Sequence, residues 1–207
     1  MNAAMASSVR HAKPGDVAAV TALLVAALEG DPVAEWLVPD QRERHNVFQR
    51  LLAVDVDHAV EAGDVYVTLD WSAVAVWRRH DLDTERRAFG DHHLTTFAGR
   101  AAPRFDELNA TVRGYRPDAP HHWLSWLAVQ PGYGWSAADE LLRQHHRTVD
   151  RTGHPAYAVV TNEGARDLLC QHGYRPDLPL HLPSGPMIWP LQRGPRAAAP
   201  PTPASAG

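Results

Sequence analysis

Residues 121–142, HHWLSWLAVQPGYGWSAADELL, decide the fold class because they have the pattern of a strand, a short loop and a helix. The run from 121 to 129 is mostly apolar and aromatic, which is typical of a buried strand. Gly132 and Gly134 interrupt it, and a helix is predicted over 136–151. A helix N-terminus presents unpaired amides and the positive end of its dipole, so this junction suits an anionic ligand.

Strands and helices alternate along the rest of the chain. Further strands are predicted at 9–12, 65–69, 73–77, 156–161 and 186–191, with 65–77 forming a hairpin. Helices are predicted at 17–29, with Asp16 as its N-cap, and at 32–37, 41–62 and 163–172. Residues 78–115 have a mostly helical pattern with a break near Ala102-Pro103. This order predicts an α/β layered domain.

The composition excludes several classes of protein. A length of 207 residues suits one domain, placed at 1–193, and the Pro/Ala-rich segment 194–207 is expected to be a disordered tail. The formal net charge of −4 argues against a nucleic-acid partner. Cys170 is the only cysteine, which excludes an intrachain disulfide, and the 13 histidines show no zinc spacing, so no metal is expected. No signal peptide or apolar run of membrane length is seen, which favours a soluble, cytoplasmic protein.

Two segments together resemble a known family. The strand end Leu127-Ala128-Val129, followed by Pro131, and the segment TNEGARDLLCQHGY at 161–174 are similar to the two signatures of the GNAT superfamily of N-acetyltransferases. The stretches DVAAVTALLVAALEGDP (16–32) and DQRERHNVFQRLL (40–52) resemble the puromycin N-acetyltransferase branch in particular. The resemblance implies a GNAT fold, with a central twisted, partly split mixed sheet flanked by helices.

The resemblance also implies a cosubstrate and its binding residues. Acetyl-CoA would lie in the split of the sheet, and a small-molecule amine would attack its thioester directly, without a covalent acyl-enzyme. Backbone groups of the strand end would bind the pantetheine arm, and amides of the following loop would bind the pyrophosphate. The implied cofactor-binding residues are Leu127, Ala128, Val129, Gly134, Trp135, Ser136, Ala137, Ala138 and Asn162.

The loop departs from the family pattern and is degenerate. It is one residue short, Tyr133 replaces the usual Gln or Arg, and Ser136 replaces the first signature glycine. Ser136 and Asp139 also have the spacing of a capping box, in which side chains would occupy the free amides. Asp139 and Glu140 place negative charge where a pyrophosphate would bind. Leu169 is at the position where the family often has a tyrosine that protonates the leaving thiolate.

The candidate catalytic residues are His122, Ser125 and Tyr133. A histidine at the start of the central strand is suited to accept a proton from an ammonium group, although a pair of surface histidines is the alternative. Trp36, Trp77 and Phe97 are candidates for a substrate pocket, and ordinary core packing is the alternative for each.

These observations lead to two hypotheses. The first is transfer of an acetyl group from acetyl-CoA to a primary amine of an antibiotic or a natural-product intermediate, by a monomer or homodimer. The alternative is a GNAT-fold protein that has lost acetyl-CoA use and either catalyses a different reaction on a small natural product or sequesters it.

Overall fold

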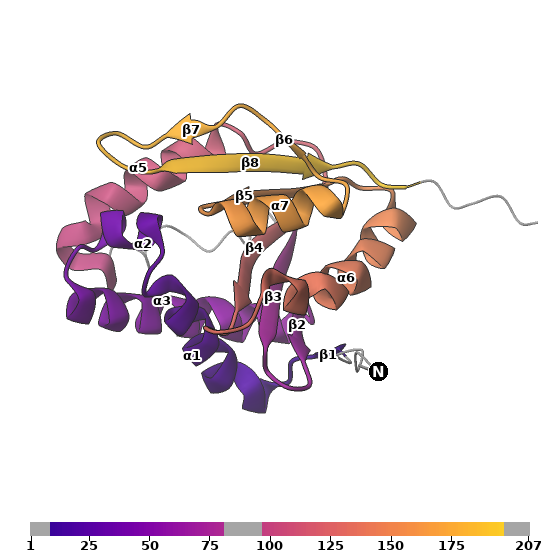
Figure 1. The fold of residues 1–207 in the computed structure, drawn as a ribbon, viewed down its shortest axis with the longest axis horizontal. Helices are drawn as coiled ribbons and strands as arrows, with labels where there is room; N and C mark the ends of the chain where they lie inside the picture. The colour runs from indigo at the N-terminus through magenta and orange to yellow at the C-terminus, as the bar shows by residue number, and fades with distance from the viewer. Residues whose placement is uncertain (1–8, 81–96, 197–207) are drawn as a thin grey trace, which may run out of the picture.

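The computed structural model describes residues 9–80 and 97–196, which fold around one twisted sheet (Figure 1). The strands lie in the order β1-β2-β3-β4-β5-β8-β6, and β7 pairs with β8 outside this path. Only β4 and β5 pair in parallel, and the other pairs are antiparallel. The strands are β1 Val9–His11, β2 Val65–Thr68, β3 Ala73–His80, β4 His121–Val129, β5 Ala156–Val160, β6 Arg175–Pro176, β7 Leu180–His181 and β8 Met187–Arg193.

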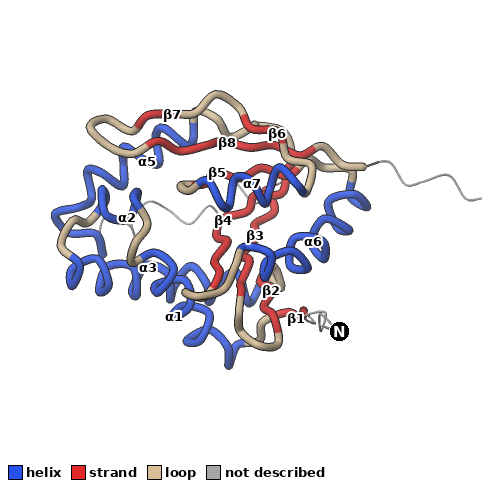
Figure 2. Tube along the Cα trace, viewed as in Figure 1, coloured by secondary structure: helices blue, strands red, loops and turns tan. Residues whose placement is uncertain are grey.

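Helices cover both faces of the sheet and give two hydrophobic cores (Figure 2). The helices are α1 Val17–Leu28, α2 Pro32–Leu37, α3 Gln41–Glu61, α5 Ala102–Arg113, α6 Asp139–Thr152 and α7 Glu163–Gln171. The side chains of Val74, Val76 and Ala128 pack on the face covered by α1, α2, α3 and α5, called here the α3 face. Ala75 and Trp77 pack on the face covered by α6 and α7, called the α6 face.

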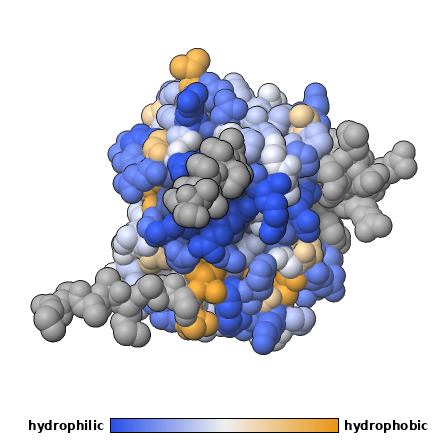
Figure 3. Space-filling model, turned by 90° about the vertical axis from the view of Figure 1, so that its right-hand side faces the viewer, coloured by the Kyte–Doolittle hydropathy of each residue, from blue (hydrophilic) through white to orange (hydrophobic). Residues whose placement is uncertain are grey.

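The two cores follow from the alternation of side chains along the strands, since neighbouring residues point to opposite faces of a sheet. Apolar residues on both faces of β3 and β4 therefore require helices on both sides. The side of the molecule that lies to the right in Figure 1 is mostly hydrophilic, with scattered apolar residues (Figure 3). Most of the large apolar side chains in the described residues lie inside the two cores.

Most of the predicted elements are confirmed. The helix at 32–37 and the strand at 121–129 have the predicted bounds, and 65–77 forms the predicted hairpin. The break predicted near Ala102-Pro103 is confirmed, because α5 starts at Ala102. Three predictions are wrong in part: residues 78–80 extend β3, the helix predicted from 136 starts at Asp139 after a 3-10 turn, and the short strands β6 and β7 were not expected. Residues 81–96 of the predicted helical segment, and 197–207 of the predicted tail, lie outside the described residues.

Asp16 does not cap α1, which corrects the prediction. Its carboxylate accepts hydrogen bonds from Arg10 and from the backbone amide of Lys13, so it is turned away from the helix that follows. Among the described helices, none combines the length and the apolar character needed to cross a bilayer. In the same residues, no group of three or more potential metal ligands comes together.

Candidate functional site

The sheet opens into a fork where β4 and β5 separate. The two strands pair only at His122–Leu124, and beyond this point β5 pairs with β8 alone. A β-bulge lies at the same place, because Leu124 and Trp126 of β4 are opposite consecutive residues of β3, which leaves Ser125 as the extra residue. From Trp126 to Val129, no described strand pairs with the β5-facing edge of β4. Its backbone groups can therefore bind an extended ligand.

The loop after β4 presents free backbone amides. Tyr133 N donates to Gln130 O and Ala137 N donates to Gly134 O, each about one turn back. Within the described residues, the amides of Gly134, Trp135 and Ser136 have no hydrogen-bond partner. The predicted capping box is wrong, because the Ser136 side chain accepts no bond from the helix and Asp139 points elsewhere. The amides at the start of this helix are free for an anion.

The negative charge next to this loop is balanced by neighbouring cations. Asp139 accepts a hydrogen bond from His172 at 2.7 Å and forms an ion pair with Arg143. Glu140 lies 3.2 Å from Arg143 and 3.6 Å from Arg147. Burial alone would raise the pKa of Asp139, but the His172 bond and the two positive charges outweigh it and lower the pKa. The repulsion of a phosphate that the sequence predicted is therefore reduced.

Trp135 spans the space between this loop and the first turn of α7. Its indole lies against the backbone of Gly164, so closely that a Cβ on that glycine would overlap the ring. Asn162 is the N-cap of α7. Its side-chain oxygen accepts a hydrogen bond from the backbone amide of Ala165 at 2.9 Å, so this oxygen is already used within the helix. Trp135 therefore fills the space between the loop and α7 on the α6 face.

The predicted catalytic residues lie in different surroundings. His122 is buried on the α6 face, with Nδ1 3.0 Å from His145 Nε2 and Nε2 3.0 Å from Thr152 Oγ1. Burial, followed by the nearby charge of His154, lowers the pKa of His122 to about 4. Tyr133 is 52% exposed at the loop, beside the free amides.

Ser125 has the position that most directly suits chemistry at the fork. Its hydroxyl is buried and has no hydrogen-bond partner in the described residues. The next residue, Trp126, donates its indole N–H to Asp55 at 2.8 Å, and Asp55 also forms an ion pair with Arg78. The bulge is thereby tied to α3 and β3. An unpartnered buried hydroxyl is costly unless a ligand or water completes it.

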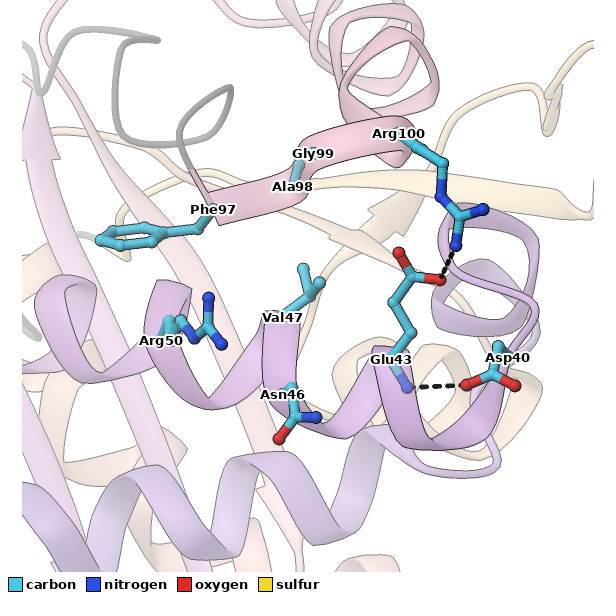
Figure 4. A pocket seen from close by; sticks show the side chains of 9 residues that line it. All are labelled: Asp40, Glu43, Asn46, Val47, Arg50, Phe97, Ala98, Gly99 and Arg100. Atoms are coloured by element: carbon cyan, nitrogen blue, oxygen red, sulfur yellow. Dashed lines mark hydrogen bonds and ion pairs between the residues drawn. The ribbon is translucent and has the colours of Figure 1, made fainter.

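The three predicted pocket residues are not brought together. Trp77 is fully buried and stacks on His145 at a centroid distance of 3.9 Å, and Trp36 packs against Gly185. Phe97 lines a cavity of about 610 Å³ between α3 and residues 97–100 (Figure 4). Glu43 on one wall meets Arg100 on the other, at 3.1 Å. This cavity is charged and open.

A second cavity, of about 210 Å³, contains residues that the sequence analysis missed. It lies over β4, β5 and β8, and its aromatic walls are Trp123, Tyr157 and Tyr115. The alternation of β4 contained a signal for it, because Trp123 is two residues from Ser125 and so on the same side of a regular strand. Nothing in the sequence places Tyr157 opposite Trp123, since the pairing of β4 with β5 joins distant segments.

Comparisons with known proteins agree with this architecture. No protein-family model matches the chain. An acetyltransferase of Corynebacterium glutamicum, described as histone acetyltransferase HPA2 and related acetyltransferase, superposes with a TM-score of 0.66 at 22% identity, over 94% of this chain and 98% of its own. A mosquito arylalkylamine N-acetyltransferase (like 5b) gives 0.60 at 15% identity, over 90% and 99% of the two chains. An agmatine N-acetyltransferase gives 0.56 at 16%, over 90% and 98%. This chain has the GNAT acetyltransferase fold, as its sequence predicted.

Proposed function

We propose that the protein transfers an acetyl group from acetyl-CoA to a primary amine of a small molecule. One observation carries the proposal: the free edge of β4, beyond the bulge at Ser125, leads directly to three unpartnered amides at Gly134, Trp135 and Ser136. An edge of this kind can bind the amides of an extended pantetheine arm, and free amides at a helix N-terminus can bind its diphosphate. The solved structures with this fold include acetyltransferases of amines, which supports the same reaction.

The chemistry requires few groups from the protein. The lone pair of the neutral amine attacks the thioester carbonyl carbon, the C–S bond breaks, and the amine proton leaves while the thiolate gains one. Ser125 lies at the bulge, where its hydroxyl would hydrogen-bond the reacting carbonyl or the attacking amine. Backbone groups of Leu127 and Val129 would hold the arm, while Ala128 packs on the α3 face of the sheet and Ala137 and Ala138 pack on the α6 face.

The hydroxyl and imidazole groups near the site differ in their access to the reacting atoms. Tyr133 is exposed beside the free amides, so it lies at the diphosphate end of the proposed site, and the strand from Ser125 to Val129 alone separates the two ends by about 13 Å. Tyr174 is buried, with its hydroxyl 3.1 Å from His146 Nε2, and Leu169 is fully buried in the core. His122 faces α6 and is hydrogen-bonded on both ring nitrogens. This arrangement favours Ser125 over His122 as the group that touches the reacting atoms.

The similarity of residues 16–32 and 40–52 to the puromycin N-acetyltransferase branch supports an antibiotic or natural-product amine as the acceptor. A cytoplasmic location, a monomeric or homodimeric state, and the lack of a nucleic-acid partner stay predictions from the sequence.

A matched pair of variants tests the amide site. Trp135→Pro and Trp135→Ala both remove the indole, but only the proline removes an amide. Gly134 before it is extended (φ −82°, ψ 156°), so proline fits at the first helical position. We expect calorimetry to show CoA binding to the alanine variant and about tenfold weaker binding to the proline variant, since a hydrogen bond to a charged group is lost. Equal affinities would remove the amides from the proposal.

The position of Trp135 favours a second candidate function. The indole fills space between the loop and the first turn of α7, beside the free amides. A protein in which it kept a diphosphate away from these amides would sequester a small natural product or act on it differently. The two functions differ in one measurement. If neither the parent protein nor Trp135→Ala binds CoA, and no amine releases free thiol from acetyl-CoA, the second function replaces the first.

A further inference from the structure

The smaller cavity lies directly beside the fork. Trp123 pairs with Tyr157, and the next pair, Leu124 with Ala158, is the last one before the strands separate. Val159, the first β5 residue beyond that pair, also lines the cavity. Trp123 precedes Ser125 by two residues, so the rings begin about 6–7 Å from the bulge, given the rise of a strand. A ring bound there would be within a short linker of the reacting carbonyl.

The walls of this cavity suit a flat aromatic group. Three aromatic side chains line it, and about 210 Å³ is enough for a group of one or two rings. Tyr157 also packs edge-on against His121, at a centroid distance of 5.4 Å, which fixes one wall. Offset-stacked and edge-to-face contacts between aromatic groups are favourable beyond the area that they bury.

Charges around the cavity disfavour an acceptor with several positive charges. The Arg116 guanidinium lies 4.7 Å from the centre of the Trp123 ring, which is one wall of the cavity. Burial is the main cause that lowers the pKa of His121, so this ring is neutral at pH 7 and adds no charge to that of Arg116. Asp177 is the one carboxylate among the described lining residues, and it lies at the β6 end, farthest from β4.

The larger cavity is a poorer site for such a group. Asp40, Glu43, Arg50 and Arg100 all line it, so its walls are charged rather than aromatic (Figure 4). Arg50, the lining residue nearest to Asp55 on α3, precedes it by five residues, or about 7–8 Å of helix, and Asp55 is bonded to Trp126 at the bulge, so charge rather than distance separates the two cavities.

We propose that the cavity of Trp123, Tyr157 and Tyr115 binds the ring of the acceptor, and that the substrate is a monoamine joined to an aromatic ring by a short linker, rather than a polyamine. The proposal rests on the proposed function and narrows its substrate class.

Kinetics with tryptamine and spermidine as acceptors test this class. We expect kcat/KM for tryptamine to exceed that for spermidine at least tenfold. Tyr157→Leu should raise the KM for tryptamine about tenfold and change kcat less than twofold, because it removes a ring wall and no reacting group. Tyr115→Leu, at a 46% exposed position, tests the opposite wall without disturbing the core. Leu69→Ala, at a 56% exposed position in the β2–β3 hairpin, is the control and should match the parent protein.

Binding of tryptophol, which has the ring and linker but no amine, separates this inference from the proposed function. Calorimetry should detect tryptophol with the parent protein and with Leu69→Ala, and a several-fold weaker affinity with Tyr157→Leu and Tyr115→Leu. A preference for spermidine that depends on Asp177, shown by its loss in Asp177→Asn, would overturn the aromatic assignment and leave acetyl transfer intact. Tryptophol binding that depends on Tyr157, without CoA binding or thiol release, would keep the aromatic site and overturn acetyl transfer.

Discussion

At the scale of single residues, Gly164 is explained by the Trp135 indole, which leaves no space for a Cβ on the first turn of α7. Glycine is otherwise unfavourable inside a helix, by about 1 kcal/mol relative to alanine. Its presence in α7 is therefore explained by the contact with Trp135. The effect of a substitution at Gly164 on stability should depend on which residue is at position 135.

Gly164→Ala is expected to have opposite effects in two backgrounds. In the parent protein, the new Cβ must displace the indole, and we expect a loss of about 1–2 kcal/mol of unfolding free energy. In the Trp135→Ala background, the obstacle is absent, and the helix preference should give a gain of about 0.5–1 kcal/mol. Urea unfolding of the four proteins as a double-mutant cycle measures the coupling. A destabilisation of the same size in both backgrounds would mean that the contact has no energetic weight.

The residue scale also shows what the sequence could not predict about the site. Alternation along β4 correctly implies that His121 and His122 face opposite ways, but the partners that decide their roles, His145 for one and Tyr157 for the other, lie far along the chain. The bulge at Ser125 adds one residue and so reverses the alternation from Trp126 onward. No local sequence pattern predicts such a bulge. The separation of β4 and β5 beside it could therefore be expected only from the family resemblance.

At the scale of elements, local signals predicted the starts of α2 and α3 correctly, but the local caps predicted at Asp16 and Ser136 were wrong. Asp31 caps α2 and Asp40 caps α3, each accepting backbone amides of the first turn, and both helices start where predicted. β6 and β7 have two residues each, too few to show a period. Residues 78–80 are charged or polar, which concealed their place in β3, where they pair with the start of β4. Their pairing is decided by the neighbouring strand.

The link between β8 and α6 depends on a buried ion pair. Arg193 is 3% exposed and donates two hydrogen bonds to Asp150, at 2.8 and 3.1 Å. We expect Asp150→Asn to cost about 2–4 kcal/mol of unfolding free energy, because it leaves a buried guanidinium with a weakened partner. Arg193→Met combined with Asp150→Asn should cost less than Asp150→Asn alone. The same comparison of urea midpoints tests this, and a double variant less stable than the single one would contradict it.

At the scale of the whole molecule, the α6 face has an unusual core, because it buries three histidines under the helix. His122, His145 and His146 are at most 5% exposed. Their hydrogen-bond partners include one another and two tyrosines, Tyr66 and Tyr174. The composition shows how many histidines the chain has. It cannot predict that these three lie together, because that depends on the packing of α6 against β4. Three of the 13 histidines therefore have a structural role in this core.

These histidines make the stability of the whole fold sensitive to acid. Burial is the main cause that lowers their pKa, to about 4 for His122, about 2 for His145 and about 3 for His146, from an ordinary value of 6.5. Below pH 6.5 the unfolded chain therefore binds protons that the folded chain does not, and stability falls as the pH falls. Each group contributes up to about 1.4 kcal/mol per pH unit until its folded-state pKa is reached. We expect the urea midpoint to be constant near pH 7–8 and to fall steeply between pH 6 and 4.5.

One substitution separates the histidines from the carboxylates that also titrate in acid. His146→Gln keeps a polar partner for the Tyr174 hydroxyl but does not titrate, so it should reduce the pH slope by about one group's share. His181→Gln, on the surface, is the matched control. Because His146 is buried, the parent and variant are compared by their slopes from pH 6 to 4.5 rather than by their absolute stability at one pH. If both variants retain the parent slope, the acid sensitivity does not come from the core beneath α6, and the neutral state of its histidines loses its support.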